Sequence, residues 1–260
     1  MKPIRVYLCE DTPEGIFTAI YDAGKSGYGQ KYIRIQARMP GEAEDMDLFS
    51  EYVTVQPEEE KVQKVLRTVR SRISERVYED ILYVVCSEAG DKANVIYHYI
   101  VYGFAMGAGV ADALQIPWVQ RVREMRRQLQ NEVHHYLGFL RFQEIQHQPP
   151  ILLAVFEPKG RILPMVMEHF ADRLNQEHFI IYDKIHGEAG FYDPEKKWFI
   201  RALEEKEAQQ LQQLEEQLEV YAELWQTFFD TIKISERENT ALQQNNLPLR
   251  FRGHMPEFQK

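Results

Sequence analysis

The chain has few cysteines, which form disulfide bridges and metal sites, and it has no long apolar run that would anchor it in a membrane. Its only cysteines among 260 residues, Cys9 and Cys86, lie far apart and form no Cys-x-x-Cys pair. This spacing excludes a disulfide framework and indicates neither a zinc nor an iron–sulfur site, so we expect no metal and no cofactor. No apolar run of about 18 residues occurs, and the apolar N-terminal run meets Glu10 and Asp11 at once. We therefore expect a cytoplasmic protein without an export signal or a membrane segment.

The chain also has fewer positively than negatively charged residues. The chain has 31 Lys and Arg residues against 40 Asp and Glu residues, which gives a net charge of -9. This charge repels a polyanion such as DNA at long range, so local patches must make any contact with it. Segments 42–60 and 204–223 are acidic, whereas 61–76 and 121–127 are basic. This segregation permits one cationic face on an acidic molecule.

The N-terminal part is predicted to form a βα element followed by a helical bundle. Residues 4–9 have the pattern of a strand, and Thr12 and Pro13 suit the cap and first turn of a helix over 14–23. Short strands are predicted next, and apolar residues at helical spacing follow them. The strands are expected at 32–36 and 52–55, and the helices at 58–71, 75–87, 92–106 and 118–142.

After Pro149 and Pro150 the pattern becomes that of a small mixed sheet. Strands are predicted at 151–156, 178–182, 190–192 and 197–200, with a helix over 163–174. The fold class is therefore α+β and predominantly helical. A boundary between domains 1–148 and 149–260 is expected at the two prolines, although one continuous domain fits the pattern equally well.

A long C-terminal helix is predicted over 211–232, where apolar residues alternate three- and four-residue spacing. Such a seam either pairs with another chain or docks on the protein's own body. Trp225 and Phe228 favour the second interpretation, because large rings suit a surface with pockets better than a regular two-stranded seam.

The predicted helix 118–142 carries a cationic row beside an apolar stripe. At about 100° per residue, the stripe residues fall within roughly 80° of one another, and the row falls about 100° further round. Such a row suits a phosphate backbone, but it is also common on an ordinary solvated helix flank. The stripe comprises Val122, Met125, Leu129, Val133, Tyr136 and Leu140, and the row comprises Arg123, Arg127, Gln130, His134 and Arg141.

Four aromatic residues, Tyr97, Tyr99, Tyr102 and Phe104, interleave on the predicted helix 92–106. Exposed rings at this spacing stack on nucleic-acid bases. Buried rings form core, which is their more common role.

Residues 24–27 resemble the end of a phosphate-binding P-loop. That motif requires glycine at position 19, where Ala19 stands, and a strand before the loop instead of a helix. We therefore assign no P-loop.

His169 and Asp172 lie one helical turn apart, and Asp183 comes directly after the next predicted strand. These side chains can serve as metal donors or as acid–base groups, but they match no recognised spacing. They are the only candidate catalytic residues, and we expect His169 to be a packed, structural histidine. The sequence does not decide whether the protein is an enzyme.

The C-terminal tail alternates cationic and aromatic groups, with Arg250 and Arg252 on either side of Phe251. This composition suits contact with phosphate and base together. A tail of this kind can equally tuck its rings into the body of the protein.

Several motifs occur in a characteristic order along the chain. They are the segments 12–21, 119–142 (which includes Glu132, His134 and His135), 169–173, 181–183, 225–229 and 248–258. In this order they resemble a bacterial family assigned to DNA metabolism or DNA repair. Its members are encoded beside a radical S-adenosylmethionine protein or are fused to a uracil-DNA-glycosylase-like domain. The resemblance spans nearly the whole chain.

The resemblance implies a role near DNA. The chain lacks the cysteine set that holds a radical enzyme's cluster, and we expect no fused glycosylase domain. The leading hypothesis is an accessory protein that binds DNA and engages the radical S-adenosylmethionine protein or a uracil-DNA-glycosylase-like protein. The alternatives are an enzyme acting on a nucleotide or damaged base, and a protein-binding adaptor. The candidate DNA-binding residues are Arg123, Arg127, His134, Arg141, Arg250 and Arg252.

Overall fold

The computed structural model describes residues 2–38, 47–145, 148–211 and 251. The chain divides into two compact units, Met1–Leu129 and Gln130–Lys260. Helix α5 (Pro117–Phe139) begins in the first unit and ends in the second. The domain boundary expected at residue 148 stays a prediction.

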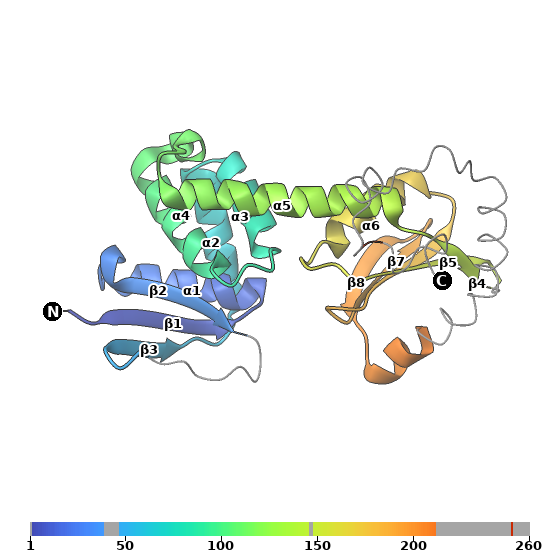
Figure 1. Cartoon of the computed structure of the whole chain (residues 1–260), viewed down its shortest axis with the longest axis horizontal. Coiled ribbons are helices and arrows are strands. Elements are labelled where there is room, and N and C mark those ends of the chain that lie inside the picture. Colours follow the sequence, from blue (N-terminus) through green and yellow to red (C-terminus); the bar gives the residue numbers. More distant parts are fainter. Residues whose placement is uncertain (1, 39–46, 146–147, 212–250, 252–260) are drawn as a thin grey trace, which may run out of the picture. The chain divides into compact units, whose positions relative to one another are not determined.

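The first unit contains a parallel three-stranded sheet. Its strands are β1 (Ile4–Glu10), β2 (Ile33–Arg38) and β3 (Ser50–Thr54), in the order β2-β1-β3, with Val6 opposite Arg34 and Tyr52 (Figure 1). Helix α1 (Pro13–Lys25) follows β1, and the Thr12 hydroxyl accepts a hydrogen bond from the Gly15 amide at 3.0 Å. The βα start predicted from Thr12 and Pro13 is confirmed.

Three further helices of the first unit follow β3 and precede α5. These are α2 (Glu59–Arg72), α3 (Glu75–Val85) and α4 (Lys92–Met106), followed by a 3-10 turn over Gly107–Asp112. They agree closely with the predicted helices. Helix α4 approaches Ile73 so closely at Gly103 that an added Cβ would lie 2.8 Å from the Ile73 side chain. The core includes Ile16, Phe17, Val69, Ile81, Ile96 and Tyr99.

Helix α5 buries the apolar stripe predicted for it. Met125 is fully buried, and Val133 is half-buried. The helix ends at Phe139, three residues before the predicted end, and strand β4 (Gln143–Ile145) follows. The sequence pattern missed β4 because only pairing with the neighbouring strand makes so short a segment extended. The other stripe residues, Val122, Leu129, Tyr136 and Leu140, are buried.

The second unit contains the mixed sheet predicted from the sequence, with strand order β4-β5-β6-β7-β8. Strands β5 and β6 are parallel and are joined by α6, and the other neighbours are antiparallel (Figure 1). Gly190 lies against the Met167 side chain so closely that no Cβ fits between them. The bounds are β5 (Ile151–Phe156), α6 (Leu163–Arg173), β6 (His178–Asp183), β7 (Glu188–Asp193) and β8 (Lys197–Ala202).

Residues 205–211 are helical, and the long C-terminal helix predicted beyond them lies outside the described residues. Within the described part of the chain, no single helix is long and apolar enough to cross a membrane. Two successive helical segments, Lys92–Asp112 and Pro117–Phe139, together have the length and apolar composition of a membrane span, but the chain bends between them.

Candidate functional site

Two arginines at the start of α5 are neutralised by carboxylates of the first unit. Arg121 forms a two-point ion pair with Asp91, at 3.0 and 3.1 Å, and contacts Glu124 at 3.2 Å. Arg126 forms an ion pair with Asp80, which also accepts a hydrogen bond from the Tyr99 hydroxyl at 2.7 Å. These contacts join α5 to α3 and α4, so both arginines are structural.

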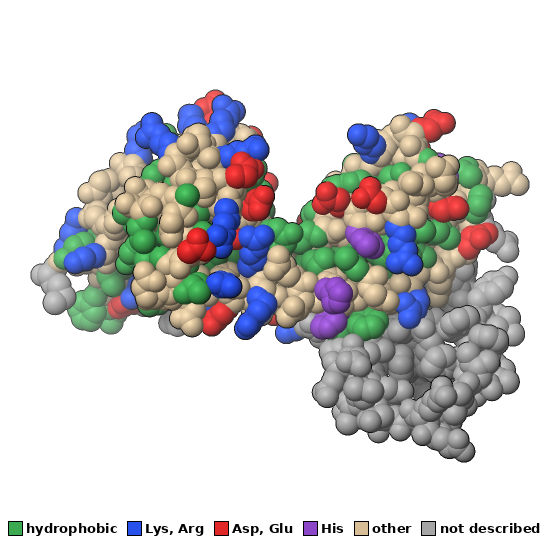
Figure 2. Space-filling view, turned by 90° about the horizontal axis from the view of Figure 1, so that it is seen from above, with side chains coloured by type: hydrophobic (Ala, Val, Ile, Leu, Met, Phe, Trp, Pro, Cys, Tyr) green, Lys and Arg blue, Asp and Glu red, His purple; other side chains and the backbone are tan. Residues whose placement is uncertain are grey.

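Arg123 and Arg127 differ from these neighbours. Both are exposed, and neither makes a hydrogen bond or an ion pair with any residue that the structure describes. They lie one helical turn apart, which places their Cβ atoms about 6 Å from each other. Figure 2 shows one face of the molecule, on which Lys and Arg side chains of the first unit are interspersed with carboxylates. The cationic character of the helix flank is therefore local and rests on this pair.

The remaining members of the predicted row lie in the second unit. His134 is exposed, with its ring centroid 6.3 Å from that of His135. Arg141 is half-buried and donates a hydrogen bond to the Gly138 carbonyl at 3.2 Å. The structure thus brings Arg123 and Arg127 together within one unit, while His134 and Arg141 belong to the other.

Arg250 and Arg252 lie outside the described residues, but Phe251 between them is described. Its side chain is buried, with its ring centroid 4.9 Å from those of His135 and Tyr136. This contact confirms, for Phe251, the interpretation in which the tail tucks its rings into the body.

The candidate catalytic residues do not form a cluster. His169 and Asp172 are exposed on α6, whereas Asp183 is fully buried at the end of β6. The Asp183 carboxylate accepts hydrogen bonds from the Ile185 and His186 amides, and it lies 2.6 Å from His186 Nδ1. Because all three contacts are within three residues, Asp183 stabilises the turn between β6 and β7. No group of three potential metal ligands occurs among the described residues.

The expectation that His169 is a packed, structural histidine is wrong. The imidazole is exposed, and the buried member of this helical turn is Phe170, which is 4% exposed. The helical periodicity correctly placed His169 and Phe170 on different faces of α6, but it did not determine which face is buried.

Two polar residues missed by the sequence analysis meet at the carboxyl end of β1. Lys92 is buried and lies 2.7 Å from Asp11, and it also donates a hydrogen bond to the Ser87 carbonyl at 2.7 Å. The ion pair fixes the start of α4 beside the end of β1. Burial raises the pKa of the neighbouring Cys9 thiol to about 12, so this cysteine is protonated and unreactive at neutral pH.

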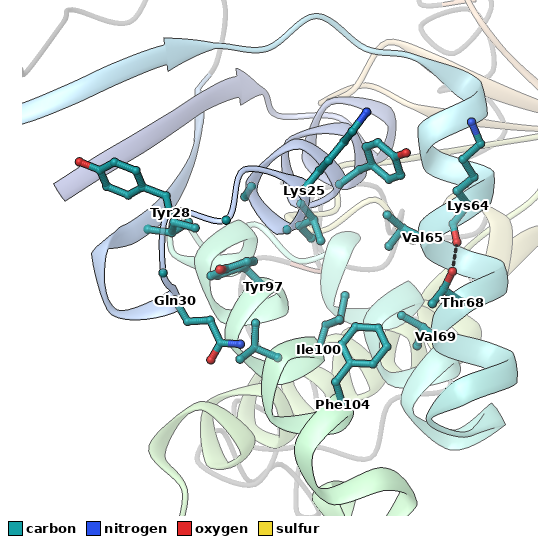
Figure 3. Close-up of a pocket in the computed structure, with 18 residues that line it drawn as sticks. Lys25, Tyr28, Gln30, Lys64, Val65, Thr68, Val69, Tyr97, Ile100 and Phe104 are labelled. Carbon is teal, nitrogen blue, oxygen red and sulfur yellow. Dashed lines mark hydrogen bonds between the residues drawn. The ribbon is translucent and has the colours of Figure 1, made fainter.

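The sequence analysis also missed a pocket in the first unit. The cavity has a volume of about 610 Å³ and lies among the end of α1, the loop that follows it, α2 and α4 (Figure 3). Tyr97 stands in its centre, and Phe104 borders it, so two of the rings noted on α4 line a cavity. Tyr99, in contrast, is core, and Tyr102 is exposed. No sequence signal linked these rings to α1 and α2, because the segments meet only in the fold.

The structure thus defines a helix-rich α+β protein of two units, with an exposed arginine pair and an apolar pocket in the first. The chain belongs to the DUF4130 family, which is described as a domain of unknown function, and the match covers residues 90–257. The match begins next to α4, includes all of α5 and continues through the second unit. A search of curated proteins gave no match.

Proposed function

We propose that this DUF4130 protein is an accessory protein of DNA metabolism or repair that binds DNA through Arg123 and Arg127. The observation that carries the proposal is the contrast within one stretch of α5. Arg121 and Arg126 have carboxylate partners, whereas Arg123 and Arg127 are exposed without one among the described residues. Guanidinium groups in this state suit phosphate oxygens, because they form paired hydrogen bonds without first breaking an ion pair.

The charge balance limits what kind of DNA binding this pair supports. With a net charge of -9, the chain as a whole repels DNA, so two phosphate contacts give weak binding that depends on salt. Weak binding suits a protein that positions DNA for a partner. His134 and Arg141 are candidates for further contacts, as are Arg250 and Arg252 in the tail.

The proposed partner is a radical S-adenosylmethionine protein, as the family resemblance implies, or a uracil-DNA-glycosylase-like protein. Two distant cysteines cannot supply the ligand set of an iron–sulfur cluster. In this proposal the partner carries out the reaction on the damaged DNA, and this chain binds and positions that DNA.

Fluorescence anisotropy with labelled single-stranded and double-stranded DNA tests the proposal. The variant Arg123→Ala/Arg127→Ala should bind both DNA forms more weakly than the wild-type chain. The matched control is Arg67→Ala/Arg72→Ala, which removes the same charge from two exposed arginines of α2 that make no ion pair with a described residue. Equal weakening by both variants would indicate a general charge effect, and no weakening by either would place the site elsewhere.

The alternative of an enzyme acting on a nucleotide or damaged base gains no support from the geometry. Its candidate groups are separated, since His169 and Asp172 face solvent and Asp183 is committed to a turn. The adaptor alternative depends on the C-terminal helix, which lies outside the described residues. Co-purification with and without DNA separates an adaptor, which binds the partner protein alone, from the proposed DNA-binding protein.

A further inference from the structure

The pocket of the first unit is formed by residues from three separate parts of the sequence. Ile20 and Gly24 come from α1, Val65 and Val69 from α2, and Ile100 from α4. Its volume of about 610 Å³ lies within the range of small-molecule sites, which is about 300 to 1,000 Å³. The lining is mostly apolar, so a ligand here must bury a hydrophobic body.

Tyr97 places one polar group inside this apolar lining. Its side chain is only 3% exposed, yet its hydroxyl makes no hydrogen bond with a residue that the structure describes. The hydroxyl is not one of the fully enclosed polar atoms that lack a partner, so it is open to the cavity and available to a ligand. Burial raises the pKa of Tyr97 to about 12, so the hydroxyl keeps its proton at neutral pH and can donate a hydrogen bond to a ligand oxygen.

The charged residues that line the pocket are two lysines, and no acidic residue lines it. Lys25 is exposed and has no ion pair among the described residues, and Lys64 forms only a surface pair with Glu60 at 3.3 Å. Both side chains extend toward the same side of the pocket in Figure 3. Tyr21 adds an aromatic ring beside them, with its centroid 6.0 Å from the Lys64 ammonium group. The open side therefore attracts an anionic group.

We infer that this pocket binds a small aromatic anion. The ring system lies against Tyr97 and the aliphatic side chains of α2 and α4, a ligand oxygen accepts a hydrogen bond from the Tyr97 hydroxyl, and the anionic group lies between Lys25 and Lys64. Two kinds of molecule have this chemistry, a nucleotide and an aromatic carboxylic acid. The pocket does not include the arginine pair on α5, so binding of the aromatic anion does not depend on DNA binding.

Titration of the full chain with the fluorescent aromatic anion anilinonaphthalene sulfonate tests the inference. The variant Lys25→Gln/Lys64→Gln should weaken binding by about tenfold, and Tyr97→Phe by about fivefold. Gly24→Phe should abolish binding, because Gly24 lines the pocket and a Cβ there meets nothing within 4 Å. The control Arg67→Gln/Arg72→Gln makes the same change in charge on α2 outside the pocket and should bind like the wild type.

Competition then distinguishes the two sources of ligand. Displacement of the probe by deoxyadenosine monophosphate but not by naphthoate identifies a nucleotide site, and the reverse identifies an aromatic acid site. Thermal melts of each variant must show a folded chain, since partly unfolded proteins also bind this probe. Probe binding that survives in folded Gly24→Phe, or that falls equally in the lysine variant and its control, would overturn the inference.

Discussion

Arg121 and Asp91 form a two-point ion pair, with Nε 3.0 Å from Oδ2 and Nη2 3.1 Å from Oδ1. Arg123, two residues further along the same helix, has no such partner among the described residues. The helix turns by about 200° between the two positions, so Arg123 points away from the carboxylate that pairs with Arg121. This relationship separates arginines that hold the fold from arginines that remain available to a ligand.

The first prediction concerns the salt dependence of DNA binding. If Arg123 and Arg127 contact phosphates, Arg123→Ala/Arg127→Ala should lower the slope of log K against log salt by about one to two. Arg121→Ala should leave that slope almost unchanged and should lower the free energy of unfolding by about 0.5 kcal/mol, as for a surface ion pair. Anisotropy titrations at several salt concentrations measure the slope, and an identical slope in all three proteins would contradict the prediction.

The second prediction concerns the buried carboxylate of Asp80, which serves both Tyr99 and Arg126. Asp80→Ala leaves a phenol and a guanidinium without their acceptor, so it should lower the free energy of unfolding by about 3 kcal/mol. Tyr99→Phe should cost about 1 kcal/mol alone and less in the Asp80→Ala background, because the shared contact is already lost. Urea denaturation of the double-mutant cycle measures this coupling, and strictly additive effects would argue against a shared network.

The third prediction concerns Glu132, a buried residue of α5 that lies in the second unit. Its carboxylate accepts hydrogen bonds from the backbone amides of Lys159 at 2.9 Å and Gly160 at 3.2 Å. Glu132→Ala should lower the free energy of unfolding by about 2 kcal/mol, since two amides lose their acceptor. Glu132→Gln should cost less because it keeps one oxygen. Equal melting temperatures for wild type and Glu132→Ala would refute this role.

The fourth prediction concerns pH. Burial lowers the pKa of His98, which stacks on Trp118 with 4.3 Å between ring centroids, below its ordinary value of 6.5. The unfolded chain therefore binds a proton at higher pH than the folded chain does. The contribution of neutral His98 to the free energy of unfolding is therefore full above pH 6.5, and it is lost as the pH falls through 6.5 toward the pKa of His98 in the folded chain. Urea midpoints across this range should fall less in His98→Phe than in the wild type, and parallel profiles would contradict the assignment.

The fifth prediction compares two neighbours on α6. His169→Ala should change the free energy of unfolding by less than about 0.5 kcal/mol, because the imidazole is exposed. Phe170→Ala should cost about 3 kcal/mol, because the ring is buried and its centroid lies 4.9 Å from that of Phe142. Chemical denaturation of the two variants measures both values. A large loss in His169→Ala would restore the structural role that the sequence suggested.

Local signals in the sequence were sufficient for most of the secondary structure. Thr12 and Pro13 predicted the start of α1, and the stripe through Met125 predicted the buried side of α5, because capping and helical periodicity act within a few residues. The same signals failed at β4, whose extended form depends on pairing with β5. They also could not orient α6 on its sheet, so His169 was assigned to the wrong environment.

The sequence by itself determined which residues of α5 face the core and which carry charge on its flank. Only the tertiary structure decided that Arg121 and Arg126 are neutralised while Arg123 and Arg127 remain exposed. The reason is that the acidic partners lie 30 and 46 residues away along the chain, so no local pattern reports them. The pocket around Tyr97 arose in the same way, since α1, α2 and α4 meet only when the chain folds. Periodicity is a property of neighbouring residues, whereas ion pairing and cavities depend on residues that folding brings together.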